Sequence, residues 1–191
     1  YTKDRQKAWE IIEKLGLCSE QESKVQFTMA DRKINAVLST SAGRLFDGVS
    51  AILGIRRKST FEGEASMALE FAAEEYQKTL LEKSTQQISE TEKYSYHKEN
   101  TGSDRLQLNT ESLIKEIMNR RLNGEDPGSL AYFFHQELSR QIITACVQIR
   151  QQSGCNKVAL SGGVFQNRLL LELTDHGLKD QGFEVLKHQL V

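Results

Sequence analysis

Residues 161–167, which read Ser-Gly-Gly-Val-Phe-Gln-Asn, combine residue types that suit the binding of an anion. They separate a short apolar run from a leucine-rich stretch with helical spacing. Adjacent glycines let a ligand approach the backbone closely, and a helix start has unpaired N–H groups and the positive end of the helix dipole. A nucleotide phosphate fits this chemistry, and the Asn167 amide can donate to or accept from a phosphate or a ribose. The pattern also fits a tight strand-to-helix turn in which Asn167 is only a helix cap.

A second group of small residues, at 39–43, precedes another stretch with helical spacing. Hydroxyl groups and a glycine at a helix start suit an anion or a sugar. Asp47 falls one turn after Gly43 on the same helix face, so it can reach a ligand held over that N-terminus. Arg44 can pair with an acid or a phosphate. The structural alternative is an ordinary N-cap, a solvated Arg44 and an Asp47 bonded to nearby backbone.

Residues 61–65, Phe-Glu-Gly-Glu-Ala, form a third loop that leads into a helix. Gly63 can let a ribose or adenine edge lie against the backbone while Glu64 accepts hydrogen bonds from its hydroxyl groups. The alternative is a charged first helical turn in which Glu62 and Glu64 are favoured by the helix dipole.

Periodicity and capping signals predict a helix-rich chain that becomes α/β at its end. The first predicted helix covers 3–16, and the second follows a capping box at Ser19 and Glu22 and has an apolar stripe through Val25, Met29 and Ile34. A third helix is predicted to end at Gly54, and a fourth to cover 63–82. The last two are predicted from Thr110 to about Gly124 and as a long helix that begins at Asp126 and Pro127. A β-hairpin is predicted within 83–109. A strand–helix–strand unit at 157–160, 167–178 and 183–186 predicts a parallel strand pair with a right-handed crossover.

The overall composition is that of an ordinary soluble protein. The chain has 191 residues, with 25 Lys+Arg against 26 Asp+Glu, and 38% of its residues are hydrophobic. These proportions exclude the disordered and collagen-like classes. No apolar run approaches the roughly 18 residues of a membrane span, and no basic excess indicates nucleic acid as a partner. A single proline and the lack of Gly/Ser-rich stretches predict one compact unit.

The cysteines and histidines do not follow a metal-ligand pattern. Cys18, Cys146 and Cys155 are odd in number and lack C-x-x-C spacing, which fits reduced thiols in a cytoplasmic protein. The four histidines include no i, i+4 pair, so we expect no metal site made from this chain alone. His135 lies on the apolar face of the long helix, where we expect a core or interface histidine rather than a ligand.

Taken together and in this order, the three loops resemble those of the HypF family of hydrogenase-maturation carbamoyltransferases. The residues that carry the resemblance are Thr-Ser-Ala-Gly-Arg-Leu-Phe-Asp at 40–47, Phe-Glu-Gly-Glu-Ala at 61–65 and Leu-Ser-Gly-Gly-Val-Phe-Gln-Asn-Arg-Leu-Leu at 160–170. The Gly-Gly-Val-x-x-Asn element is shared with the tRNA threonylcarbamoyladenosine enzymes of the same actin-like superfamily. The resemblance covers essentially all of residues 1–191, but only the C-terminal part of the family's much longer proteins.

The resemblance implies an α/β, helix-rich fold: one lobe of an actin-like (ribonuclease-H-like, ASKHA) nucleotide-binding domain, with the nucleotide between two lobes. By match of the loops, nucleotide contacts are expected from Ser161, Gly162, Gly163 and Asn167. The ribose and base side is expected to be lined by Ser41, Gly43, Asp47, Gly63 and Glu64.

The resemblance also implies an activity. The family activates carbamoyl phosphate with ATP, forms carbamoyl adenylate and releases pyrophosphate. The carbamoyl group then passes to the C-terminal cysteine thiol of the partner protein HypE, where dehydration makes the cyanide ligand of NiFe hydrogenase. The family's acylphosphatase-like, zinc-finger and carbamoyl-adenylate-forming domains and its first lobe, with the histidine pair that holds a divalent metal, match nothing in residues 1–191. We therefore expect a fragment that folds but carries no catalytic residue or metal ligand and is inactive alone.

Two alternatives stay open from the sequence. The first is a threonylcarbamoyl-transferring enzyme that acts on tRNA. The near-neutral net charge of the chain and the loop sequences, which resemble those of the hydrogenase-maturation family, argue against it. The second is a helical module that docks a partner protein and whose loops are only turns. It predicts no response to nucleotide and an exposed apolar helix face.

Overall fold

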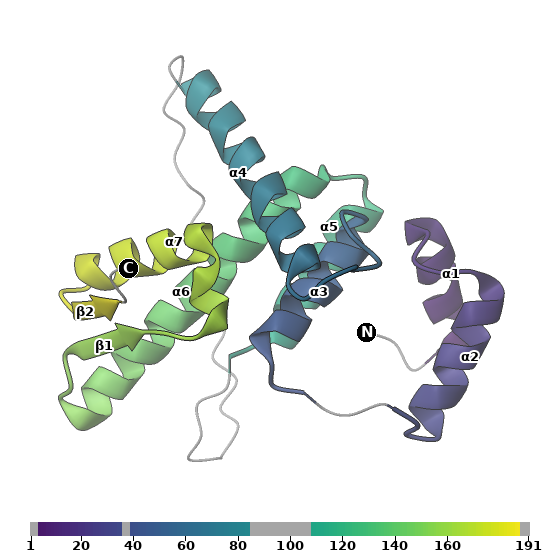
Figure 1. The fold of residues 1–191 in the computed structure, drawn as a ribbon, viewed down its shortest axis with the longest axis horizontal. Coiled ribbons are helices and arrows are strands. Elements are labelled where there is room, and N and C mark those ends of the chain that lie inside the picture. The colour runs from purple at the N-terminus through teal and green to yellow at the C-terminus, as the bar shows by residue number, and fades with distance from the viewer. Residues whose placement is uncertain (1–3, 36–38, 85–107, 188–191) are drawn as a thin grey trace.

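A computed structural model of the chain describes residues 4–35, 39–84 and 108–187 (Figure 1). In chain order its elements are α1 (Arg5–Leu15), α2 (Glu20–Asp31), α3 (Ala42–Leu53), α4 (Glu64–Ser84), α5 (Thr110–Leu122), α6 (Pro127–Ser153), β1 (Lys157–Leu160), the 3-10 helix η1 (Gly163–Gln166), α7 (Arg168–Asp180) and β2 (Glu184–Lys187). Apart from Lys83 and Ser84, which end α4, and the residues just before α5, the predicted hairpin at 83–109 lies outside the described residues.

Glycine caps and a capping box set helix ends that the sequence predicts. α1 is followed by Gly16 with a φ of 60°, and α3 by Gly54 with a φ of 77°. Both are in the left-handed conformation, which costs glycine little because it has no Cβ. Before α2, the Ser19 hydroxyl accepts from the Glu22 N–H while the Glu22 carboxylate accepts from the Ser19 N–H, so the predicted capping box is confirmed.

The starts of α5 and α6 differ in how well the sequence locates them. Pro127 is at the tolerated first position of α6, and the Asp126 side chain caps the helix, as predicted. α5 is capped by Asn109, one residue earlier than the predicted Thr110. A side-chain amide and a hydroxyl are both good caps, so the sequence Asn-Thr does not decide between them.

The apolar stripe predicted along α2 is wrong. The helix ends at Asp31, and the side chains of Val25 and Ile34 are 55% and 47% exposed. α2 packs mainly against α1 (Figure 1), so a single neighbouring helix covers only part of its surface. The side chains of Val25 and Ile34 therefore lie outside the contact between α1 and α2.

α6 carries both hydrophobic clusters of the described residues. The larger one joins α3, α4, α5, α6 and the start of α7, and its largest fully buried side chains are Phe46, Leu53, Leu69, Ile117, Leu130, Phe134 and Leu170. A smaller cluster of Leu160, Leu178 and Phe183 packs with the C-terminal half of α6. Phe165 in η1 contacts both clusters. The loop before α7 is therefore held over the junction between the two.

β1 and β2 form a two-stranded parallel sheet, which confirms the predicted strand–helix–strand unit. The register pairs Lys157 with Glu184 and Leu160 with Lys187, so β2 begins one residue after the predicted start. Figure 1 shows the sheet and α7 beside the C-terminal half of α6. None of the helices in the described ranges combines the length and hydropathy that crossing a bilayer requires.

Candidate functional site

The start of α7 has protein acceptors for the N–H groups of its first turn. The Asn167 Oδ1 accepts from the Leu170 N–H at 2.8 Å. One carboxylate oxygen of Glu70, in the first third of α4, accepts from the N–H groups of Arg168 at 2.5 Å and Leu169 at 3.2 Å. A capping amide and a carboxylate from another helix thus occupy the positions that an anionic ligand would take at a bare helix start.

The prediction of unpaired N–H groups at this helix start is therefore wrong. The reason is Glu70, whose negative charge is itself favoured at a helix N-terminus. Burial raises the pKa of the Glu70 carboxyl, and the hydrogen bonds from the Leu169 and Arg168 N–H groups act in the opposite direction. A second anion placed against this end of α7 would meet both a repelling carboxylate and a shortage of donors.

His135, in the first half of α6, is hydrogen-bonded to Asn167 and fully buried, which confirms the expected core histidine. Its Nε2 lies 3.0 Å from the Asn167 Nδ2, and its Nδ1 lies 2.7 Å from the carbonyl oxygen of Ala131. Because the Asn167 Oδ1 faces the Leu170 N–H, its Nδ2 must be the donor toward His135. The Nε2 therefore accepts, and the ring proton is on Nδ1, where it is donated to Ala131. Burial lowers the pKa of His135 to about 4, so the ring is neutral at pH 7.

The His135 ring also contacts Phe46 of the second loop motif. The two ring centroids are 5.5 Å apart in an edge-to-face arrangement, and Phe46 makes a similar contact with Phe134 at 4.9 Å. Such aromatic pairs stabilise a core beyond the area they bury. His135 thus touches one residue from the motif at 40–47 and one from the motif at 161–167.

The two glycines after β1 lie exposed at the surface, where Gly162 precedes η1 and Gly163 is its first residue. Gly162 has a φ of 91°, a conformation that other residues rarely adopt. Gly163 has an ordinary φ, and a Cβ added to either glycine would meet nothing within 4 Å. The structure thus gives a conformational reason for Gly162 alone. The space above both backbones is open, as close approach of a ligand requires.

The predicted residues at the start of α3 are also at the surface. Ser41 is the N-cap residue, but its side chain makes no capping hydrogen bond. Gly43 is exposed, and the half-buried Asp47 accepts from the exposed Arg44 at 3.2 Å rather than from nearby backbone. α3 contacts η1, so this corner and the Gly162–Gly163 turn belong to neighbouring elements.

The predicted residues of the third loop are engaged in holding that loop together. Gly63 has a φ of 83°, which explains a glycine there. One carboxylate oxygen of Glu64 pairs with Arg56, and the other accepts from the Thr60 N–H at 2.5 Å and the Thr60 hydroxyl at 3.1 Å. The oxygens predicted to accept from a ribose are thus already bonded within the chain. Glu64 precedes Glu70 on α4 by six residues, or about 9 Å along the helix.

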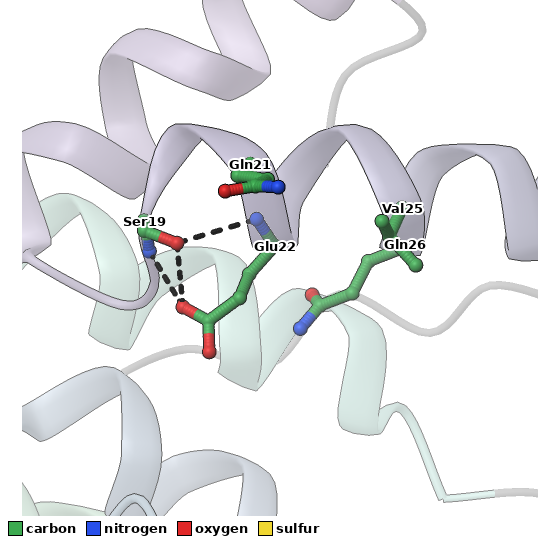
Figure 2. A pocket seen from close by; sticks show the side chains of 5 residues that line it. All are labelled: Ser19, Gln21, Glu22, Val25 and Gln26. Carbon is green, nitrogen blue, oxygen red and sulfur yellow. Dashed lines mark hydrogen bonds between the residues drawn. The ribbon is translucent and has the colours of Figure 1, made fainter.

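No metal centre marks this region within the described residues. No group of three or more His, Cys, Asp or Glu side chains in residues 4–35, 39–84 and 108–187 is placed to hold a metal ion. A surface hollow of about 450 Å³ lies instead along α2 and is lined by Ser19, Gln21, Glu22, Val25 and Gln26 (Figure 2). Figure 2 shows that Ser19 and one carboxylate oxygen of Glu22 are hydrogen-bonded to each other in the capping box. No predicted site residue lines the hollow.

Two residues that the sequence motifs do not include, His135 and Glu70, prove central to the arrangement. His135 connects the motifs at 40–47 and 161–167, while Glu70 connects α4, which begins in the third motif, to the start of α7. A buried histidine and a carboxylate on an otherwise well-packed helix are weak signals in a sequence, because each is far along the chain from its partners.

Comparisons with known proteins show the family to which the chain is similar. A family model described as carbamoyltransferase, Kae1-like domain, second subdomain, matches residues 2–191. The probable carbamoyltransferase HypF of Methanocaldococcus jannaschii is 28% identical over 186 residues, which are 97% of this chain and 22% of that protein. The carbamoyltransferase HypF of Synechocystis is 37% identical over 151 residues, which are 79% of this chain and 17% of that protein. The chain thus spans about a fifth of the length of these relatives.

Solved structures show the same fold. A crystal structure of full-length HypF in the phosphate- and nucleotide-bound form is similar over 93% of this chain and 22% of that one, with a TM-score of 0.76 and 31% sequence identity. The crystal structure of T. kodakarensis HypF covers 86% of this chain and 19% of its own, with a TM-score of 0.61 at 23% identity, and shows the fold alone. The expected fold, a helix-rich α/β lobe of a Kae1-like domain, is confirmed.

Proposed function

The chain belongs to the HypF carbamoyltransferase family, and from this premise we propose that it forms one wall of the nucleotide site of such an enzyme. The observation that carries the proposal is the family match over residues 2–191 together with the adjacency of α3 and η1, which hold two of the three loop motifs. In the whole protein, the reaction would convert carbamoyl phosphate, ATP and water into carbamoyl adenylate, with release of inorganic phosphate and pyrophosphate. The carbamoyl group would then pass in the cytoplasm to the C-terminal cysteine thiol of HypE, with release of AMP, in the maturation of NiFe hydrogenase.

The backbone around Gly162 and Gly163 would meet the phosphate groups. Both glycines face open space, whereas the start of α7 is closed by Asn167 and Glu70. A phosphate would therefore bind to the loop itself and not to the end of the α7 dipole. This assignment differs from the sequence-based expectation for Asn167, whose side chain is 8% exposed and bonded at both ends within the chain.

The start of α3 would meet the sugar. Ser41 makes no side-chain capping bond, and the Asp47 carboxylate at the surface can accept hydrogen bonds from ribose hydroxyls. Glu64 is a weaker candidate because both of its oxygens bind Arg56 and Thr60. A divalent metal belongs to the proposal for the whole protein, and residues 4–35, 39–84 and 108–187 hold no group of three or more side chains placed to bind one.

Two glycine substitutions test the proposal without disturbing the fold. In Gly163→Ala the new methyl group enters open space, so it covers only the backbone that a phosphate would approach. Gly48→Ala is the matched control, because its Cβ also meets nothing within 4 Å and it lies outside the predicted contacts. Calorimetric titration of ATP and AMP into the chain should show binding that Gly163→Ala weakens about tenfold, the effect of losing one or two charge-assisted hydrogen bonds, and that Gly48→Ala leaves unchanged.

Equal ATP affinity of Gly163→Ala and wild type would refute the phosphate assignment. If the wild-type chain binds no nucleotide, this lobe is insufficient alone, and the same two variants would be compared in the whole protein by carbamoyl-phosphate-dependent release of pyrophosphate from ATP. We expect no such release from residues 1–191 alone, and measurable release would contradict that expectation. Assays of transfer to a HypE thiol and to tRNA then distinguish the two activities. Transfer to the thiol supports the hydrogenase-type function, and transfer to tRNA supports the tRNA-modifying alternative.

A further inference from the structure

His135 contacts residues of two of the proposed nucleotide-binding motifs on their buried side. Its ring packs edge-on against Phe46, which lies in the motif at 40–47, and its Nε2 lies 3.0 Å from the Asn167 Nδ2. Neither contact reaches the surface, since His135 and Phe46 are fully buried and Asn167 nearly so. The imidazole therefore lies beneath the loops and between the elements that carry them.

The hydrogen-bond chain through His135 has a single direction. Ala131 accepts from Nδ1, Nε2 accepts from the Asn167 amide, and the Asn167 Oδ1 accepts from the Leu170 N–H. Reversing any one link would place two donors or two acceptors face to face. The orientation of the Asn167 side chain, and with it the point where the loop meets α7, is thus fixed from α6.

Neither proton transfer nor ligand contact accounts for this histidine. The ring has no exposed surface, and its burial and the bond to Ala131 are the influences on its pKa, with no contribution from a charged side chain of the described residues. Glu70 acts on the other side of Asn167, through the Arg168 and Leu169 N–H groups.

We propose that His135 is a positioning residue, which sets the loop at 161–167 against α3 so that Gly162 and Gly163 present their backbone to a nucleotide. The proposal deepens the proposed function and rests on it for the identity of the ligand. The positioning itself rests on the contacts of His135 with Phe46, Ala131 and Asn167.

A matched pair of substitutions tests the hydrogen bonds of the two ring nitrogens of His135 separately. His135→Gln places a carbonyl oxygen close to the position of Nε2, so it can still accept from Asn167. His135→Asn places an amide N–H close to the position of Nδ1, so it keeps the bond to Ala131 but leaves Asn167 without its acceptor. Both variants are neutral amides that remove the aromatic contact with Phe46, so a general loss of core packing affects them alike.

Two readouts are compared in the 191-residue chain. We expect hydrogen exchange of the Leu170 N–H, measured by NMR, to be about tenfold faster in His135→Asn than in His135→Gln, the effect of losing one buried hydrogen bond. We expect ATP affinity, measured by calorimetry, to fall about tenfold in His135→Asn and to be retained in His135→Gln. Equal exchange rates in the two variants would overturn the proposal, as would faster exchange in His135→Asn with undiminished ATP affinity.

The wild-type chain provides a further test that does not depend on a variant that folds. Ring ¹⁵N chemical shifts should show the proton of His135 on Nδ1 and an unprotonated Nε2. A proton on Nε2 would overturn the proposal, because that nitrogen could not then accept from Asn167. If the wild-type chain binds no ATP, the nucleotide site is tested in the whole protein as described above, while the Leu170 exchange rates and the ring tautomer of the 191-residue chain still decide whether His135 positions the loop.

Discussion

The starts of α7 and α3 look alike in sequence but differ in structure. Each follows a loop that contains small residues, and the sequence predicts that each could bind an anion. At α7, the side chains of Asn167 and Glu70 take up the N–H groups of the first turn. At α3, the Ser41 side chain makes no capping bond. We call the start of α7 closed, because protein side chains bind its first N–H groups, and the start of α3 open, because no described side chain caps it.

The difference shows that a glycine-rich loop before a helix does not by itself make an anion site. What decides is whether another element supplies a carboxylate to the same N–H groups, and Glu70 comes from 98 residues earlier in the chain. A closed helix start makes the α7 end a rigid support, while binding would fall to the exposed loop before it. The closed start should therefore respond strongly to substitution, and the open one weakly.

The largest effect is expected for Asn167→Ala. It removes the cap of α7 and leaves the buried Nε2 of His135 without a donor, which together should lower the free energy of unfolding by about 3 kcal/mol. Urea unfolding measures this. Ser19→Ala, which removes an exposed cap with no buried partner, is the control and should cost about 1 kcal/mol. Equal losses for the two variants would mean that the bond to His135 adds no stability.

A pH effect of nearly the same size should come from His135. Its pKa is about 4 in the folded chain against about 6.5 when unfolded. Between these values the unfolded chain binds more protons, so stability is fully present above pH 6.5 and falls by up to about 3 kcal/mol as the pH drops to 4.

The raised pKa of Glu70 has the opposite sign, since its contribution to stability is lost as the pH rises through its folded pKa. The informative quantity is therefore the difference between wild type and His135→Gln, measured by urea unfolding at pH 7 and pH 5. The wild type should lose more stability on acidification than the variant does. A parallel decrease in both chains would show that His135 is already protonated at pH 7 or free to protonate at little cost.

A smaller effect is expected for Glu70→Ala. It leaves the N–H groups of Arg168 and Leu169 without an acceptor, which should cost about 2 kcal/mol. The exposed Glu75 lies on the same helix, and Glu75→Ala should change stability by less than about 0.5 kcal/mol. Thermal unfolding of both variants at one pH tests this, and a loss for Glu70→Ala no greater than that for Glu75→Ala would show that α7 does not depend on the carboxylate.

The smallest effect should come from the open helix start. Ser41→Ala removes a hydroxyl that makes no capping bond, so the free energy of unfolding should change by less than about 0.5 kcal/mol. Chemical denaturation alongside Ser19→Ala gives the comparison within one chain. A loss of about 1 kcal/mol or more at Ser41 would show that this end is capped in solution and would erase the distinction between the two starts.

Local signals were enough to predict most helix ends and the strand–helix–strand unit. Gly16, Gly54, Ser19 and Pro127 act within a few residues of themselves, and a cap can be recognised without knowledge of the fold. The parallel pairing of β1 and β2 also follows from local order along the chain. The positions of the three loop motifs at the starts of helices likewise came from the sequence.

The role of Glu70 could not be predicted, because it depends on a contact between distant segments. Along α4 the buried stripe is Ala65, Leu69 and Ala73, at a spacing of four residues, and Glu70 lies at its border. The neighbouring Phe71 is the more apolar residue, yet its side chain is 59% exposed. Hydrophobicity alone would predict a buried Phe71 and an exposed Glu70. Glu70 is buried instead because its carboxylate accepts hydrogen bonds from the first N–H groups of α7.

The length of α6 has a consequence for how the chain loses its structure. A helix of 27 residues extends about 40 Å, and both hydrophobic clusters rest on it, joined by Phe165. α1 and α2 contact the remainder chiefly through α5 and through the bond from Arg57 to the Leu15 carbonyl. Partial unfolding should therefore begin with α1 and α2. The rest of the described chain should unfold as one cooperative unit, because both hydrophobic clusters pack on α6.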